Sequence, residues 1–247
     1  VEEARAAGVE SFAFVTSQGK TLIEDHFDSH YELYETLERR GKEAELASAK
    51  ATEIAAGDLA IMRQHTPLGL GHAVWCARDF IGNEPFAVIL PDDVILSKTP
   101  ALKQMVDAYS KVGGNMVAVE EVPMEQVHRY GILDVDQDDG KIASAKGLVE
   151  KPNAEDAPSN LSIIGRYILQ PEIFDILDKR ETGAGGEIQL TDAIAKMIGP
   201  MPFHGFRFDG TRYDCGNKAG FVAANVAFAM AREDVADDVR NMVKDLV

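Results

Sequence analysis

The run Phe86-Ala87-Val88-Ile89-Leu90, bounded by Pro85 and Pro91, constrains the fold more than any other stretch. It is uncharged and rich in β-branched and aromatic side chains, which is typical of a strand buried on both faces, as in a parallel sheet. Asp92 and Asp93 follow at its carboxyl end. Ligands of open α/β sheets bind outside the carboxyl ends of the strands, so these acids stand where a substrate and a hard cation would meet. The alternative is that they only form a turn or cap a helix.

Composition excludes some partners. The chain has 247 residues, 45% of them hydrophobic and 27% charged, and a formal net charge of -16. An acidic surface argues against nucleic acid and against an anionic membrane. Cys76 and Cys215 are the only cysteines, too few for a disulfide framework and without the spacing of a zinc site. No apolar run reaches the ~20 residues of a membrane span. We therefore expect a cytoplasmic protein with neither nucleic acid nor a membrane as partner.

Strand and helix patterns alternate along the chain, which predicts an α/β protein. The opening helix runs into a strand, which is typical of the second half of a βαβ unit whose first strand would precede Val1. Residues 59–90 show the pattern of a second βαβ unit, with a strand, a Gly-containing turn, a helix and another strand. A hairpin pattern at 130–135 and from 142 onward adds antiparallel strands. Strands are expected at 11–16, 59–63, 86–90, 115–122, 163–169 and 203–208, and helices at 21–46, 72–80, 100–112, 187–197, 219–232 and 235–246.

A glycine turn precedes the helix that begins near His72. Gly69 and Gly71 flank one residue there, so the backbone can approach a flat ligand, or an anion at a helix N-terminus. One G-x-G is a weak signal, and His72 is as well explained by capping or packing.

Three further positions are candidates for chemistry. Glu150 and Lys151 place a carboxylate and an ammonium at a strand end, although neighbours on a strand point to opposite sides and are usually solvated. Gly165 interrupts a strand where a side chain would obstruct whatever approaches the sheet. Asp214 follows a strand-like run and can share a divalent cation with Asp92 only if the fold brings the two together.

Several short motifs occur along the chain: Pro67-Leu68-Gly69-Leu70-Gly71-His72-Ala73, Ile89-Leu90-Pro91-Asp92-Asp93, Val149-Glu150-Lys151-Pro152, Ser159-Asn160, Gly165-Arg166-Tyr167, Gly183 to Ala193 and Asp214-Cys215-Gly216-Asn217-Lys218. As a set, they resemble the bacterial UTP:glucose-1-phosphate uridylyltransferases, a family of UDP-glucose pyrophosphorylases. The resemblance implies a Rossmann-like nucleotidyltransferase fold, with a mixed, mostly parallel central sheet flanked by helices and a β-hairpin extension. It also implies an enzyme that makes UDP-glucose and pyrophosphate from UTP and glucose 1-phosphate with Mg²⁺, as a homodimer or homotetramer.

The resemblance also implies roles for single residues. Asp92, Lys151 and Asp214 are implied to be catalytic, with Asp92 and Asp214 as the magnesium ligands and Asp93 as a second match to the first of these acids. Lys151 corresponds to the residue that reaches the sugar phosphate. The nucleotide-binding positions are Gln64, Gly69, Gly71 and Asp92, and the sugar-binding positions are Gly131, Glu150, Lys151, Asn160 and Gly165.

The resemblance runs from Val1 to about Ala229 and implies one transferase domain. Residues 1–125 would form its nucleotide-binding part, 126–218 its sugar-phosphate-binding part, and 219–247 its C-terminal helices. The family's first strand and Gly-rich loop, with an Arg and a Lys that grip the triphosphate, would precede Val1, and we expect them in the complete protein. Two alternatives stay open: a related pyrophosphorylase for another base or sugar, and a non-catalytic regulator that binds UDP-glucose. The 67–73 and 185–193 runs favour the uridine and glucose enzyme.

Overall fold

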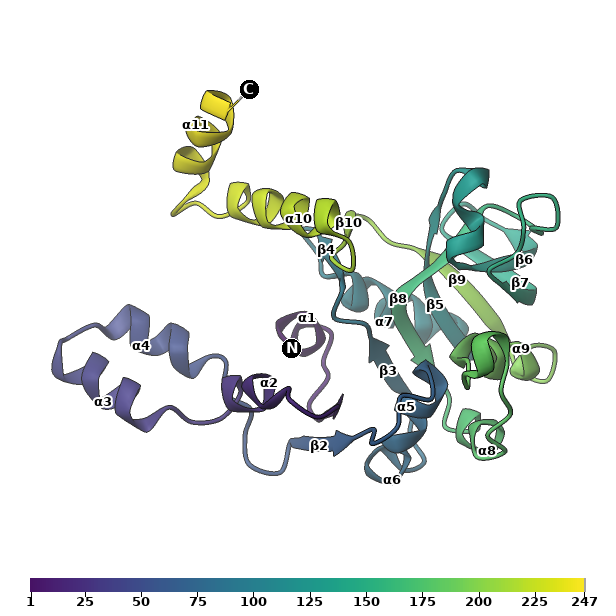
Figure 1. Ribbon diagram of the computed structural model, residues 1–247, viewed down its shortest axis with the longest axis horizontal. Coiled ribbons are helices and arrows are strands. Elements are labelled where there is room, and N and C mark those ends of the chain that lie inside the picture. The colour runs from purple at the N-terminus through teal and green to yellow at the C-terminus, as the bar shows by residue number, and fades with distance from the viewer. Residues whose placement is uncertain (247) are drawn as a thin grey trace. The chain divides into compact units, whose positions relative to one another are not determined.

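A computed structural model describes residues 1–246 of the chain (Figure 1). They form two compact units, each assembled from separate stretches of sequence. The larger unit contains Val1–Gly8, Asn83–Ile176 and the chain from Thr191 onward. The smaller unit contains Val9–Gly82 and Leu177–Leu190. No helix of the described chain is long and apolar enough to cross a bilayer.

A six-stranded mixed sheet is the framework of the larger unit. Its strand β8 lies between β3 and β5 and is buried at all nine positions, as expected for a run rich in Ile and Leu that is covered on both faces. β8 runs antiparallel to β3 and β5, β5 runs parallel to β9, and β7 runs antiparallel to β9 and β6. In spatial order the strands are β3 (Phe86–Ile89), β8 (Leu161–Leu169), β5 (Asn115–Glu121), β9 (Phe203–Arg207), β7 (Ile142–Glu150) and β6 (Gly131–Asp138).

The predicted α/β class, mixed sheet and β6–β7 hairpin are confirmed, but the prediction of a mostly parallel sheet is wrong. Among neighbouring strands of this sheet in the described chain, only β5 and β9 pair in parallel, because β8 lies between β3 and β5 and runs antiparallel to both. The 86–90 run therefore pairs in antiparallel fashion. The predicted βαβ unit from 59 to 90 is also wrong, since its two strands belong to different sheets.

Helices and a short ribbon complete the larger unit. The apolar face of α7 buries Leu102 and Met105 completely, and α7 packs against β5 and β8. β4 and β10 form a separate antiparallel ribbon, against which α10 packs. The remaining elements are α1 (Glu2–Ala6), β4 (Asp93–Leu96), α7 (Ala101–Val112), η1 (Met124–Arg129), α8 (Ile173–Leu177), α9 (Leu190–Met197), β10 (Thr211–Asp214), α10 (Lys218–Met230) and α11 (Ala236–Leu246).

The smaller unit contains two parallel strands and several short helices. The expected helix over 21–46 is broken into three, at Asp28–His30 and at Gly41, whose φ of 66° ends a helix. The spacing of Tyr31 with Phe27, Tyr34 and Leu37 in the sequence indicates one apolar helix face, yet Tyr31 is 76% exposed. The elements are β1 (Phe12–Thr16), α2 (Thr21–His26), α3 (Tyr31–Arg39), α4 (Glu43–Lys50), β2 (Leu59–Arg63), α5 (Leu70–Cys76), α6 (Arg78–Ile81) and η2 (Ala184–Gly186).

Candidate functional site

The ribbon of β4 and β10 brings the two distant acids together. Asp214 pairs with Asp93 across the ribbon, and the Cys215 N–H donates to the Asp92 carbonyl at 2.7 Å. A Cβ built on Gly216 would lie 3.0 Å from Oδ1 of Asp214 and 3.3 Å from Oδ2 of Asp92. Carboxylate oxygens of both acids therefore face one small space, which only the absence of a side chain at Gly216 leaves open.

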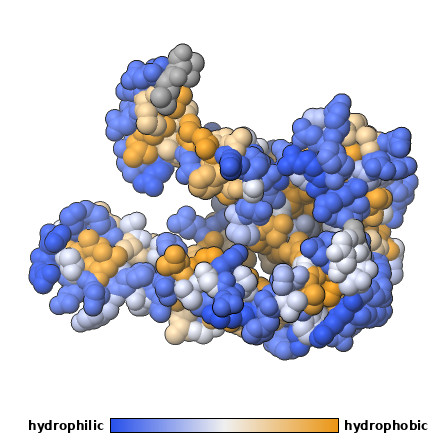
Figure 2. Space-filling model, in the orientation of Figure 1, coloured by the Kyte–Doolittle hydropathy of each residue, from blue (hydrophilic) through white to orange (hydrophobic). Residues whose placement is uncertain are grey.

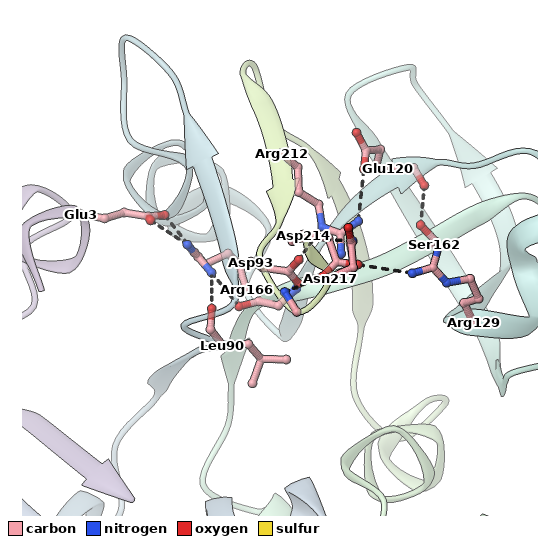
Figure 3. Close-up of polar contacts among 12 residues, drawn as sticks. Glu3, Leu90, Asp93, Glu120, Arg129, Ser162, Arg166, Arg212, Asp214 and Asn217 are labelled. Atoms are coloured by element: carbon pink, nitrogen blue, oxygen red, sulfur yellow. Dashed lines mark hydrogen bonds and ion pairs between the residues drawn. The ribbon is translucent and has the colours of Figure 1, made fainter. Parts of the chain in front are cut away.

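Asp93 makes contacts different from those of its neighbour. It is 7% exposed, accepts a hydrogen bond from the Gly165 N–H at 2.7 Å, and pairs with Arg212 Nε at 2.5 Å (Figure 3). Arg212 also lies 3.8 Å from Glu120. Burial raises the pKa of Glu120, and the Arg212 charge opposes that shift. Both oxygens of Asp93 are thus engaged in holding β4, β8 and β10 together, which argues against the weaker match of Asp93 to a metal ligand.

Asp214 also meets a cation of the chain itself. Arg129, at the end of η1, lies 3.3 Å from Asp214 Oδ2. Figure 3 marks this contact with a dashed line. Oδ1 of Asp214 accepts from the Gly216 N–H at 2.9 Å. The Arg129 side chain is 45% exposed, and an ion pair this accessible is weak and easily exchanged for another ligand. Asp214 can therefore exchange Arg129 for a cation that binds more strongly.

The donor set fits a divalent cation that keeps water or phosphate ligands. Within residues 1–246 no group of three or more His, Cys, Asp or Glu side chains could form a protein-only metal cage. Mg²⁺ usually binds through one or two carboxylates, with water and substrate phosphates completing an octahedron. The pair Asp92 and Asp214 fits that pattern.

A second group of candidates lies where β6 and β7 pair. Gly131 is directly opposite Glu150, and a Cβ on Gly131 would lie 3.2 Å from Glu150 Oε2. Lys151 Nζ lies 3.2 Å from Glu150 Oε1. The expectation that neighbours point to opposite sides does not apply, because β7 ends at Glu150 and Lys151 has a left-handed φ of 48°. Such a backbone is strained for a residue with a side chain and is frequent at functional sites.

Sequence reasoning missed Thr191 at this second group. Its Cγ2 would lie 3.2 Å from a Cβ on Gly131, and its buried Oγ1 has no hydrogen-bond partner within the described chain. A buried hydroxyl without a partner is uncommon and calls for an explanation such as a bound ligand. Thr191 lies within the 183–193 motif, but a Thr in the first turn of a helix has an ordinary structural explanation, so it was not singled out.

Gly165 lies on β8, and Asn160 lies just before that strand. Asn160 immediately precedes β8, and its carbonyl accepts from the Val122 N–H at 3.0 Å. At Gly165 a Cβ would lie 2.6 Å from Leu90 Cβ and 2.7 Å from Asp93 Oδ2. The segment that approaches Gly165 is therefore the turn leading to Asp92. No described hydrogen bond joins the side chain of Asn160 to Gly131 or Glu150.

The glycine turn lies in the smaller unit. Gly69 has a φ of 101°, and a Cβ there would meet the Ile188 carbonyl oxygen at 2.8 Å. Gly71 donates its N–H to the same carbonyl at 2.9 Å, and the Ile188 N–H donates to Leu68 O at 2.7 Å. The two glycines thus allow the segment around Ile188 to pack against the start of α5. Gln64 Nε2 donates to the Gly69 carbonyl at 3.0 Å, so three predicted nucleotide-binding residues lie together.

Comparisons with known proteins agree on one family. The nucleotidyl transferase family matches residues 2–230. A UTP–glucose-1-phosphate uridylyltransferase of Komagataeibacter xylinus is 53% identical over 218 residues, 88% of this chain and 77% of the relative. The enzyme of that name from Bacillus subtilis (strain 168) is 46% identical over 247 residues, 100% of this chain and 84% of the relative.

Solved structures give the same answer. A UDP-glucose pyrophosphorylase complexed with UDP-glucose has a TM-score of 0.84 and 42% identity, covering 94% of this chain and 85% of that one. The UTP-bound enzyme from Acinetobacter baumannii has a TM-score of 0.87 and 35% identity, covering 100% and 86%. The fold, the site geometry and these likenesses agree: the chain belongs to the nucleotidyl transferase family and, within it, to the UTP–glucose-1-phosphate uridylyltransferases.

Proposed function

We propose that this protein transfers the uridylyl group of UTP to glucose 1-phosphate, forming UDP-glucose and releasing pyrophosphate. The observation that carries the proposal is the convergence of Asp92 and Asp214 on one space beside Gly216. Relatives named for this reaction, at 46% and 53% identity, support it.

The reaction needs positioning and charge neutralisation more than acid–base chemistry. A phosphate oxygen of glucose 1-phosphate attacks the α-phosphorus of UTP, and the bond from that phosphorus to the β-phosphate oxygen breaks. Pyrophosphate leaves with the bonding electron pair. The attacking oxygen is already ionised at neutral pH, so no general base is required, and in-line alignment supplies much of the rate enhancement.

The acid pair would hold Mg²⁺ in this proposal. Asp92 and Asp214 present oxygens to one space, while Asp93 stays engaged with Arg212. When bound there, a divalent cation would neutralise negative charge on the phosphates. Asp92 would thereby also contact the nucleotide.

The sugar phosphate would bind at the second group. Glu150, whose side chain is 14% exposed, can accept hydrogen bonds from two sugar hydroxyls, and Gly131 opposite it leaves room for the ring. Lys151, whose side chain is 53% exposed, can reach a phosphate and neutralise it. Asn160 and Gly165 are kept as sugar-binding positions on the strength of the family pattern. On this assignment 126–218 is the sugar-phosphate-binding part.

The uracil would bind at the glycine turn of the smaller unit. Gln64, Gly69 and Gly71 lie together there and offer an amide group beside backbone without side chains. A flat base can approach such backbone closely. These residues make 1–125 the nucleotide-binding part in this proposal.

We propose that the protein is a homodimer or homotetramer in which a second copy covers the C-terminal helices. α10 is apolar on nearly all sides, yet Phe221 is 56% exposed and Val222 61% exposed. Met242 on α11 is 53% exposed, and Figure 2 shows hydrophobic surface along these helices. A helix that is apolar all round is usually buried, and a large exposed apolar patch usually marks an interface.

The cytoplasm is the compartment that best fits the cysteines. Cys76 and Cys215 are both free. Thiols persist in the reducing cytoplasm, whereas secreted proteins tend to pair theirs. We therefore propose a cytoplasmic enzyme.

A pyrophosphate-release assay tests the proposed reaction. UTP is compared with CTP, dTTP and ATP, and glucose 1-phosphate with galactose 1-phosphate, at saturating Mg²⁺. We expect the highest kcat/KM for UTP with glucose 1-phosphate. Faster turnover of another nucleoside triphosphate or sugar phosphate would identify a related pyrophosphorylase. UDP-glucose binding without pyrophosphate release would identify a regulator.

A further inference from the structure

The side-chain amide of Gln64 has one orientation that its surroundings allow. Gln64 follows β2, and its backbone N–H donates to the Thr16 carbonyl at 2.9 Å. The Gly69 carbonyl oxygen lies 3.0 Å from one end of the amide. A carbonyl oxygen can only accept, so the atom facing it must be the nitrogen Nε2 and the oxygen Oε1 must face the other way.

His72 is a second acceptor for the same nitrogen. Its Nδ1 lies 2.9 Å from Gln64 Nε2. Burial, and to a smaller extent the nearby charge of Arg180, lower the pKa of His72 below its usual value. Both effects favour the neutral ring. Because Nε2 of Gln64 is the donor, Nδ1 of His72 accepts and the ring proton lies on its other nitrogen.

The histidine ring is itself held in place. It stacks on Trp75, with ring centroids 5.6 Å apart and planes at 20°. Trp75 donates its indole N–H to Asp178 at 3.2 Å. The guanidinium groups of Arg78 and Arg180 lie 3.7 and 4.4 Å from the Trp75 ring centroid. These contacts restrict the rotation of His72, so the acceptor that Gln64 meets is preorganised.

The result is an amide with its oxygen open to a ligand. Both amide protons of Gln64 have acceptors, whereas within the described chain nothing donates to its Oε1. Uracil carries an N–H at ring position 3, and cytosine carries a lone pair there. An outward Oε1 accepts a hydrogen bond from the N–H of uracil and is repelled by the lone pair of cytosine.

We propose that His72 is a positioning residue that sets the preference for uracil by holding the Gln64 amide with its oxygen outward. The inference rests on the proposed function, because it takes Gln64 as the residue that meets the base. Without His72, only the Gly69 carbonyl still holds the Gln64 amide, so turning its nitrogen toward the ligand costs less free energy. That turned orientation hydrogen-bonds cytosine, and the preference for uracil therefore falls.

The test is the ratio of kcat/KM for UTP to that for CTP, measured by pyrophosphate release. His72→Phe keeps a flat ring against Trp75 and removes the acceptor, and His72→Asn restores an acceptor near the position of Nδ1. We expect the ratio to fall about tenfold or more in His72→Phe and to recover for the most part in His72→Asn. The control is His26→Phe, an exposed histidine at the end of α2, which should leave the ratio unchanged.

The ratio separates positioning from a merely structural role. A structural defect lowers the values for UTP and CTP together and leaves their ratio unchanged, and that result in His72→Phe would overturn the inference. If His72→Phe does not fold, His72→Ala, which adds no bulk, must show the same fall. A wild-type protein that uses CTP as well as UTP would instead count against the proposed uridylyl transfer itself.

Discussion

Several residues of this chain are glycine or charged because of the residues that they contact, which are distant in the sequence. Gly165 was singled out because a side chain would obstruct something, and the obstructed neighbours are Leu90 and Asp93. Gly69 and Gly71 were expected to admit a ligand, and both also admit the Ile188 backbone. The sequence predicted that something approaches the backbone closely at these glycines. It could not predict which segment does so, because a glycine leaves space for any neighbour.

Gly165→Ala should destabilise the protein by about 1–3 kcal/mol. The new Cβ would lie 2.6 Å from Leu90 Cβ and 2.7 Å from Asp93 Oδ2, too close for either to stay in place. Urea unfolding measures the loss. Gly147→Ala is the control, since its nearest neighbour would be the Asp134 side chain at 3.3 Å, and it should cost much less. Equal stability of Gly165→Ala and wild type would contradict this packing.

Elements are joined by a few buried polar contacts that periodicity does not reveal. Arg166 on β8, 3% exposed, donates to both carboxylate oxygens of Glu3 on α1, at 3.0 and 2.9 Å. It also donates to the Leu90 carbonyl at 3.1 Å, and Glu3 accepts from the Leu102 N–H at 3.1 Å. One ion pair thus fixes α1, the start of α7 and the turn before Asp92.

Arg166→Met should cost about 3–5 kcal/mol, because it leaves the Glu3 carboxylate without its partner in a mostly buried position. Denaturant unfolding measures this, and a wild-type midpoint in the variant would be incompatible with a buried clamp. Arg232→Met serves as the control. Its partner Asp234 is exposed, and its loss should not change the midpoint measurably.

The β6–β7 hairpin is linked to β9 by a pH-dependent pair. Both guanidinium NH groups of Arg207 donate to Asp138 at 2.8 Å, and these bonds, helped by the Gly140 N–H, lower the pKa of Asp138 below 3.8. A carboxyl with a lowered folded-state pKa stabilises the fold above its ordinary pKa, and this stabilisation is lost as pH falls through the folded value. Asp138→Asn should therefore lose a few tenths of a kcal/mol at pH 7, since the pair is partly exposed. Urea midpoints of variant and wild type should converge as the pH falls below the ordinary pKa of an aspartate, and a gap that widens on acidification would refute the pair's role.

Strong periodic patterns predicted most helices and strands. β2 at 59–63, α7 and the β6–β7 hairpin lie where the sequence indicated, because each has a clear apolar period and a Gly or turn at its end. The β4–β10 ribbon was not predicted. Its strands have four residues each and pair across more than a hundred positions of sequence, so only the long-range contact defines them. That ribbon brings Asp92 and Asp214 together.

At the scale of the molecule, the sequence predicted one transferase domain divided in chain order, and the fold groups the chain differently. Leu177–Leu190 belongs to the smaller unit because Ile188 hydrogen-bonds Leu68 and Gly71. The assignment of 1–125 to the nucleotide and 126–218 to the sugar phosphate stays a prediction about function. The resemblance identified the family. Only the structure shows that Asp93 contacts Gly165 and Arg212, and that the Thr191 hydroxyl has no hydrogen-bond partner within the described chain.

Phe221→Asp should shift the protein toward a smaller assembly. A charge on the exposed apolar face of α10 would have to be buried when a second copy covers it. Light scattering after size-exclusion chromatography gives the mass. Phe80→Asp, on α6 and 37% exposed, should keep the wild-type mass. A wild-type protein that is monomeric at micromolar concentration would contradict the proposed interface.

The most direct test of the shared cation site is the rate of pyrophosphate release from UTP and glucose 1-phosphate in Asp92→Asn, in Asp214→Asn and in the double variant, with the exposed Asp237→Asn as control. Each single variant should lose several orders of magnitude in kcat while keeping the wild-type fold. Because both acids would hold one ion, the second substitution should cost little more than the first. Near-normal turnover in Asp92→Asn, or losses that multiply in the double variant, would contradict a cation site formed by the two acids together.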